Sequence, residues 1–122
     1  MMKLVLAILS FLISSGIEFG GIVEFDRVVH DFGKVGRDDG ELVASFNLRN
    51  NSSEPVTIYS VVSSCGCTVA SWTRESIPSG GSGQVEVTYL NDEGPYPFDK
   101  TVKVYVSGLQ KPVTLHVKGI VD

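Results

Sequence analysis

The stretch LVASFNL at residues 42–48 decides the fold, because an apolar side chain occupies every second position in it. A period of two residues sends alternate side chains to opposite faces of a β-strand, so that one face is buried while the other meets water. Valine and threonine, which suit pleated backbone, recur with the same period in three later runs. These runs are residues 85–89, 101–106 and 113–118.

Further runs, and the turns between them, bring the number of predicted strands to about seven. Less regular apolar runs occupy residues 22–29, 56–62 and 68–72. Clusters of turn-forming residues separate the runs and would interrupt a helix. These clusters are residues 36–40, 50–55, 78–83, 91–97 and 108–112. The pattern predicts an all-β fold over residues 22–121: a single antiparallel β-sandwich of about seven strands with an immunoglobulin-like layout, and a small barrel as the alternative.

Length and charge limit the classes of function. The chain has 122 residues, enough for one domain, and its 10 Lys and Arg against 14 Asp and Glu give a net charge of -4. A phosphate-binding surface needs a surplus of clustered cations, so this balance argues against nucleic acid as a partner. With 43% hydrophobic and 20% charged residues, the composition is that of a chain that folds.

Residues 1–16 have the three parts of a secretory signal peptide. A single cation, Lys3, precedes an apolar run at residues 4–13, and Ser14-Ser15-Gly16 supplies small residues for a cleavage site. The apolar run is half the length of about twenty residues that a membrane-spanning helix needs. We therefore predict an exported protein, periplasmic or extracellular, which contacts a membrane only if the signal segment stays uncleaved as an anchor.

Both cysteines lie in one tripeptide, Cys65-Gly66-Cys67. On extended backbone, residues two apart have Cα atoms about 6.6 Å from each other, near the upper limit for a disulfide, and Gly66 would let the chain bend. Three interpretations remain open: a strained disulfide suited to redox exchange, a pair of thiolates for copper(I) or zinc, or cysteines paired for structure alone. Since two ligands are too few for a zinc site, His30 or His116 would have to add a nitrogen, although the sequence places neither histidine near the cysteines. The candidate redox or metal residues are Cys65, Cys67 and His30.

No set of residues resembles a catalytic centre, because no nucleophile is accompanied by a recognisable base and orienting group. Asp31-Phe32-Gly33 is interpreted as a turn that ends the first strand, and His116 falls on the polar face of the last one. Trp72 and Tyr89 are predicted to fill the core. We expect a non-enzymatic protein with no bound cofactor, copper or zinc at the thiol pair being the exception.

Several short motifs in a fixed order resemble a known family of exported bacterial domains. They are Phe25-Asp26, His30-Asp31-Phe32-Gly33, Asn50, Ser64-Cys65-Gly66-Cys67-Thr68, Trp72, Val85-Glu86-Val87 and Val117-Lys118-Gly119. Over residues 22–121 the chain looks like DUF family 1573, a family of unknown function that is abundant in Bacteroidetes-type bacteria. The resemblance implies an immunoglobulin-like sandwich, distantly related to periplasmic chaperone and sperm-protein domains. It also implies a secreted or periplasmic location, with no established activity.

Two functions from different classes follow from these patterns. The first is an exported binding or structural module, in which an edge strand pairs with an extended segment of a partner or a loop end forms the contact surface. The partner would be another exported or cell-envelope protein. The alternative is a thiol site at Cys65 and Cys67, acting in redox exchange or in binding copper or zinc. We favour the binding module.

Overall fold

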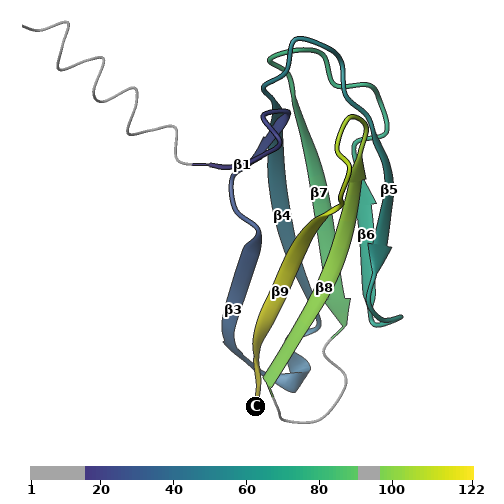
Figure 1. The fold of residues 1–122 in the computed structure, drawn as a ribbon. Helices are drawn as coiled ribbons and strands as arrows, with labels where there is room; N and C mark the ends of the chain where they lie inside the picture. Colours follow the sequence, from purple (N-terminus) through teal and green to yellow (C-terminus); the bar gives the residue numbers. More distant parts are fainter. Residues whose placement is uncertain (1–15, 91–96) are drawn as a thin grey trace, which may run out of the picture.

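The strands of the protein form two sheets that pack face to face (Figure 1). A computed structural model describes residues 16–90 and 97–122, which contain nine strands and one short 3-10 turn, η1 (Arg37–Asp39). The strands are β1 (Ile17–Phe19), β2 (Val23–Phe25), β3 (Val29–Val35), β4 (Glu41–Asn50), β5 (Ile58–Ser63), β6 (Thr68–Trp72), β7 (Ser82–Leu90), β8 (Pro97–Val106) and β9 (Val113–Val121). The prediction of an all-β sandwich is confirmed.

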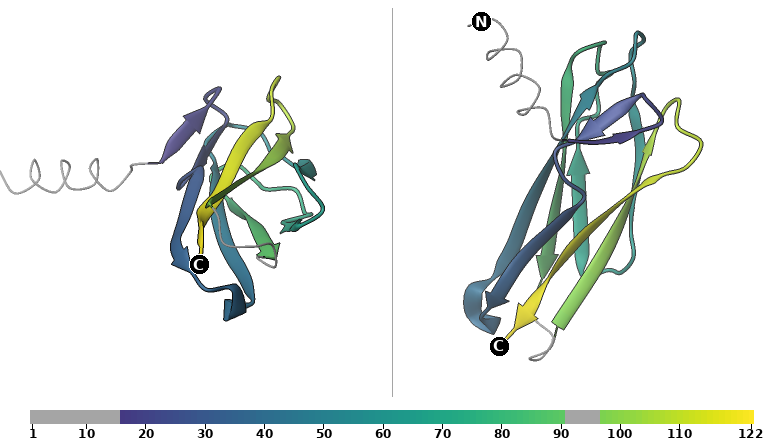
Figure 2. Two further views of the ribbon diagram at one scale, coloured as in Figure 1. Left: turned by 90° about the horizontal axis from the view of Figure 1, so that it is seen from below. Right: turned by 60° about the vertical axis from the view of Figure 1, so that its left-hand side comes forward.

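Each sheet draws its strands from distant parts of the chain. One sheet has five strands in the order β1-β2-β4-β7-β6, and the other has four in the order β3-β9-β8-β5. The chain passes repeatedly from one sheet to the other, as the two views of Figure 2 show. As a result β5 and β6, which are consecutive in sequence, are edge strands of different sheets and lie side by side.

The inward-facing side chains of both sheets make an apolar core. The period-two positions of β4, β7, β8 and β9 face inward as predicted, and Phe46 and Val104 have no exposed surface. Tyr89 is 1% exposed and stacks on Phe98, with the ring centroids 4.2 Å apart. Removing a large apolar side chain from water contributes about 1.5–3 kcal/mol, so alternation along the strands translates directly into stability.

The described residues contain more strands than the seven predicted, because the run at residues 22–29 is divided at Asp26. β2 lies before this residue in the five-stranded sheet, and β3 lies after it in the four-stranded sheet. The Asp26 carboxylate accepts backbone N–H groups of Arg27, at 2.8 Å, and of Asn47, at 3.0 Å, which holds the corner between the sheets. The short β1, which pairs with β2, was also not predicted.

β3 departs from the predicted antiparallel arrangement. It pairs with β9 in parallel, while the other strand pairs in the described residues are antiparallel. The predicted turn at Asp31-Phe32-Gly33 is also wrong in its place, since these residues lie within β3. Its local chemistry is nevertheless turn-like: Gly33 has φ +71° and donates its N–H to the Asp31 carboxylate at 2.8 Å, and the register with β9 shifts between Asp31 and Lys34.

Two predictions fall on other parts of the chain. Most of the predicted signal peptide and of the predicted turn at residues 91–97 lies outside the described residues. Over residues 16–90 and 97–122, we find no helix with the length and apolar character required to cross a bilayer.

Candidate interaction surface

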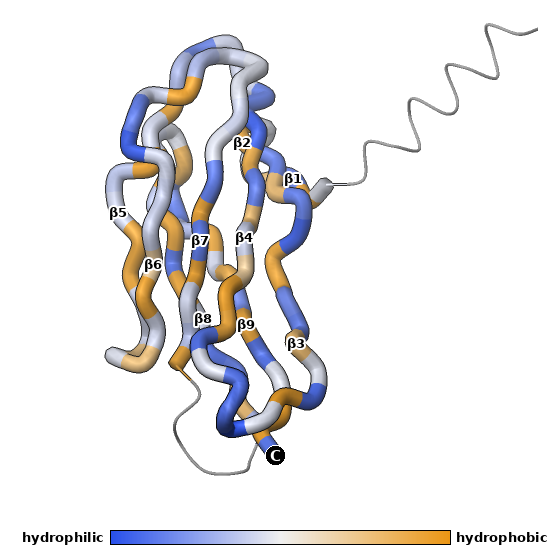
Figure 3. Tube along the Cα trace, turned by 180° about the vertical axis from the view of Figure 1, so that it is seen from behind, coloured by the Kyte–Doolittle hydropathy of each residue, from blue (hydrophilic) through white to orange (hydrophobic). Residues whose placement is uncertain are grey.

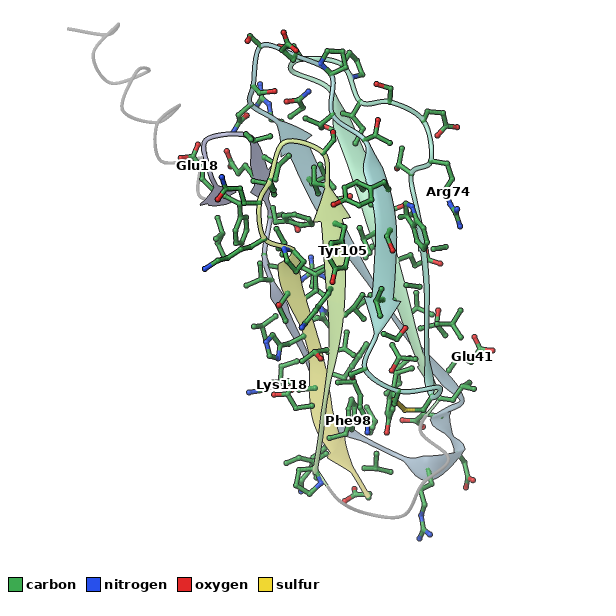
Figure 4. All side chains as sticks on the ribbon, turned by 45° about the vertical axis from the view of Figure 1, so that its right-hand side comes forward. Glu18, Glu41, Arg74, Phe98, Tyr105 and Lys118 are labelled. Atoms are coloured by element: carbon green, nitrogen blue, oxygen red, sulfur yellow. A yellow bond between two sulfur atoms is a disulfide. The ribbon has the colours of Figure 1, made fainter. Side chains whose placement is uncertain are left out.

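The two cysteines form a disulfide at the connection between β5 and β6. The Sγ atoms of Cys65 and Cys67 are bonded, and the Cα atoms lie 5.4 Å apart, closer than on extended backbone. The chain bends because the N–H of Thr68 donates to the carbonyl oxygen of Cys65, at 3.4 Å. The bridge therefore closes a turn by which the chain passes from one sheet to the other, and its sulfur atoms are drawn in yellow in Figure 4.

The surroundings of the bridge do not support the thiol alternative. The sulfur atoms of Cys65 and Cys67 lie 3.6 and 3.9 Å from the hydroxyl oxygen of Thr68. Binding of copper or zinc requires thiolates, and the described residues contain no free cysteine. They also contain no group of three or more potential ligands drawn from His, Cys, Asp and Glu. The bonded state is not that of a thiolate pair, and a disulfide is common to the other two interpretations, the redox one and the structural one.

His30 lies far from the disulfide. It is in β3, at one edge of the four-stranded sheet, whereas Cys65 follows β5 at the opposite edge. Three strand spacings, about 14 Å, separate these two edge strands across the sheet. A guanidinium nitrogen of Arg27 lies 3.1 Å from Nδ1 of His30, and since guanidinium only donates, Nδ1 accepts. Burial, and then the charge of Arg27, lower the pKa of His30, while Asp31 opposes the shift. The structure therefore does not bring His30 together with the two cysteines.

The other singled-out side chains have structural contacts. His116 is half-buried on the outer face of β9, with Nδ1 2.9 Å from a carboxylate oxygen of Asp99. Tyr89 fills the core as predicted, but Trp72 is only partly buried at the end of β6 that lies away from the disulfide. The guanidinium carbon of Arg74 lies 3.8 Å from the centroid of the Trp72 ring, a cation–π contact.

The open side of the sandwich, formed by β5 and β6, is built from an uncharged segment. Residues 55–73 contain no Asp, Glu, Lys, Arg or His, and they supply both strands. Along β5 and β6 the tube in Figure 3 is pale or orange, without the strong blue that recurs along β4 and β7. The absence of charge in this segment is evident from the sequence, but only the topology reveals that its two strands are neighbouring edge strands of different sheets.

Large side chains on this open side are exposed. Tyr59 is 61% exposed, Val62 51% and Val69 59%. Tyr59 lies where the register of β5 with β8 shifts, and its ring centroid is 6.0 Å from that of Tyr105. Figure 4 looks toward this side, with Tyr105 on the adjoining face and Arg74 at the margin. Aromatic side chains contribute a large contact area at protein interfaces and keep a polar group for hydrogen bonding.

A separate hollow of about 590 Å³ lies at the opposite edge of the four-stranded sheet, beside β3. It is formed where the β3 bulge meets β9 and β8, and its lining includes Lys34, Lys118, Phe98 and Ile120. The hollow contains neither cysteine. It mixes acidic and basic side chains, since Asp31 and Asp99 also line it.

Similar proteins agree with this fold. The family described as "Protein of unknown function (DUF1573)" matches residues 23–121, whereas no curated protein matches the chain. A protein of unknown function from Porphyromonas gingivalis W83 is 20% identical with a TM-score of 0.69, covering 82% of this chain and 46% of that one. The chain thus spans less than half of that protein.

Two further solved structures resemble the whole domain. The seventh PapD-like domain of human CEP192 is 13% identical with a TM-score of 0.67, covering 89% of this chain and 95% of that one. WR4, a member of the MSP family in C. elegans, is 10% identical with a TM-score of 0.53, covering 84% and 99%. At such identities the likeness concerns the fold, and sandwiches of this kind serve unrelated functions.

Proposed function

The chain belongs to the DUF1573 family, whose function is unknown, and for this chain we propose a role. It is an exported, non-enzymatic interaction module that binds a partner protein along its open side. Export is supported by the basic, apolar and small residues in succession at residues 1–16. The partner is then another exported or cell-envelope protein. The surface of this chain that contacts the partner is the pair of neighbouring edge strands β5 and β6.

The uncharged segment at residues 55–73 is the observation that carries this proposal. An exposed edge strand presents unpaired backbone groups, and soluble proteins commonly protect such strands with charged residues. Here two adjacent edge strands lack charge altogether and expose Tyr59, Val62 and Val69. Covering them with a partner removes apolar surface from water, at about 25 cal/mol per Å².

A photo-crosslinking experiment on the full chain in its native cells tests the proposal. A photoreactive residue replaces Val62 on the open side or, as a matched control, Val29, which is 44% exposed on the far end strand β3. We expect a discrete crosslinked protein from position 62 and none from position 29. The captured protein is then purified, and its affinity for the purified domain is measured for the wild type, Val62→Lys and Val29→Lys.

A loss of affinity in Val62→Lys alone supports the module. Equal affinities in all three proteins, or equal losses in both variants, would show that the open side has no special role. Folding of each variant is checked by circular dichroism, so that a loss of structure is not mistaken for a loss of binding.

A further inference from the structure

The two sheets have four edge strands, β1, β3, β5 and β6. Of these, β6 is the one without a feature that hinders pairing with a further strand. β1 has three residues. β3 carries His30, Asp31 and Lys34 and a register shift, and β5 has a shift between Ile58 and Ser60. Short length, charges and bulges are the common means of protecting a sheet edge. β6, in contrast, pairs with β7 in regular register along five residues and carries no charge or proline.

The backbone of β6 has donors and acceptors that point away from β7. The N–H of Leu90 donates to the carbonyl of Cys67, and the N–H of Thr73 donates to the carbonyl of Gln84, both at 3.0 Å. Because bonded and non-bonded pairs alternate in an antiparallel ladder, the odd-numbered residues of β6 face β7. The N–H and C=O groups of Ala70 and Trp72 therefore face outward from the sheet.

The outer face of the sheet carries a row of β-branched side chains, two valines and a threonine, that stops at β6. Val43 of β4 pairs with Thr88 of β7, which pairs with Val69 of β6, and the two valines are 49% and 59% exposed. On the inner face, Ala70 and Trp72 are only partly buried. A strand placed beyond β6 would extend the outer row with one set of side chains and cover Trp72 with the other.

Resting on the proposed function, we infer that the partner supplies an extended segment that joins the five-stranded sheet next to β6. The segment is five to seven residues long, on the order of the length of β6. It has no proline at the positions that face β6, and it carries an apolar side chain level with Val69. An acidic residue where it passes Trp72 would meet the guanidinium of Arg74, whose contact in the described part of the chain is the indole ring.

Trp72 provides a direct signal for this binding, because it is the single tryptophan of the chain. The probe is a synthetic peptide with the sequence QVEVTYL of residues 84–90, which already forms the neighbouring strand on the other side of β6. Excitation that avoids tyrosine reports on Trp72 alone. We expect a saturable shift of its emission to shorter wavelength as the peptide covers the ring.

Two substitutions distinguish β6 from β5. Ala70→Pro removes an N–H that faces outward and leaves the bonds to β7 in place, so the domain is expected to fold and to bind the peptide at least tenfold more weakly. Val61→Pro is the matched control: Ser64 donates to Thr101 at 2.9 Å, so the N–H of Val61 faces outward from β5 by the same alternation. This variant is expected to bind the peptide as the wild type does.

N-methylation of the peptide tests main-chain pairing without altering the domain. Methyl groups on one alternate set of nitrogens face β6 and are expected to abolish binding, while those on the other set leave it unchanged. Equal effects of both sets, unchanged binding to Ala70→Pro, or no saturable shift at millimolar peptide overturns the inference.

The same variants separate this inference from the proposed function. If the captured partner binds Ala70→Pro normally but Val62→Lys weakly, the open side remains the binding surface and strand addition at β6 is refuted. If neither change affects the partner, both conclusions are wrong.

Discussion

The disulfide is expected to contribute modestly to stability, although it closes the turn that connects the two sheets. Its closed loop contains three residues, Cys65 to Cys67. The chain-entropy relation gives a loss of about 5.4 cal/mol/K for the unfolded chain with a loop of this size, or about 1.6 kcal/mol at 25 °C. Replacing both cysteines by serine should therefore lower the free energy of unfolding by about that amount.

The expected change in melting temperature follows from the size of the domain. With an unfolding entropy of about 2.1 cal/mol/K per residue over about 105 residues, 1.6 kcal/mol corresponds to a fall of about 7 °C in Tm. Differential scanning calorimetry of the wild type and of Cys65→Ser with Cys67→Ser measures it. A reductant should lower the Tm of the wild type to a similar value and leave the double variant unchanged.

A large effect would refute this reasoning. A loss of about 4.7 kcal/mol is the value for a loop of about a hundred residues, so a loss of that size would mean that the bridge restrains much more than its own turn. Binding by the open side gives an independent check. Since Ala70 and Trp72 are held by the ladder with β7, the double variant should still bind the β7 peptide.

Three further predictions concern the core, the β3 bulge and His30. Phe46→Ala, at a position with no exposed surface, should lower the free energy of unfolding in urea by about 3–5 kcal/mol, and a loss below about 1 kcal/mol would contradict the described core. Gly119→Ala should lose about 1–3 kcal/mol, because its Cβ would lie 2.9 Å from the carbonyl oxygen of Gly33 and 3.0 Å from Phe98. Gly66→Ala, whose Cβ meets nothing within 4 Å, should stay within about 0.5 kcal/mol and serves as its control. The lowered pKa of His30 means that the unfolded chain binds a proton more readily than the folded one. The contribution of His30 to stability should therefore be constant above about pH 6.5 and fall as the pH drops below it. His30→Gln should weaken this dependence in pH-resolved thermal melts, and a profile identical to that of the wild type would argue against it.

The sequence allowed the strands to be located better than their partners. The period of two in residues 85–89 marked a buried face, and β7 has that face. The division at Asp26 was not predicted, because a carboxylate that binds the backbone of Asn47 acts across 21 positions of sequence. The parallel pairing of β3 with β9 was missed for the same reason: no short turn connects the two strands and sets their relative direction.

The candidate site followed a similar division. A cysteine pair two residues apart was evident, but the bend that brings the Cα atoms to 5.4 Å depends on a bond from Thr68, and the distance to His30 depends on the order of strands in the sheet. Neither can be obtained from spacing along the chain.

By itself the sequence determined where the regularly alternating strands lie, which of their faces are apolar, and that residues 55–73 carry no charge, because these properties depend on the order of neighbouring side chains. Only the tertiary structure decided that this segment supplies two adjacent edge strands, and that the backbone N–H and C=O groups of Ala70 and Trp72 point away from β7. Hydrogen-bond partners in a sheet are chosen by the packing of the whole chain, so an exposed edge is a property of topology.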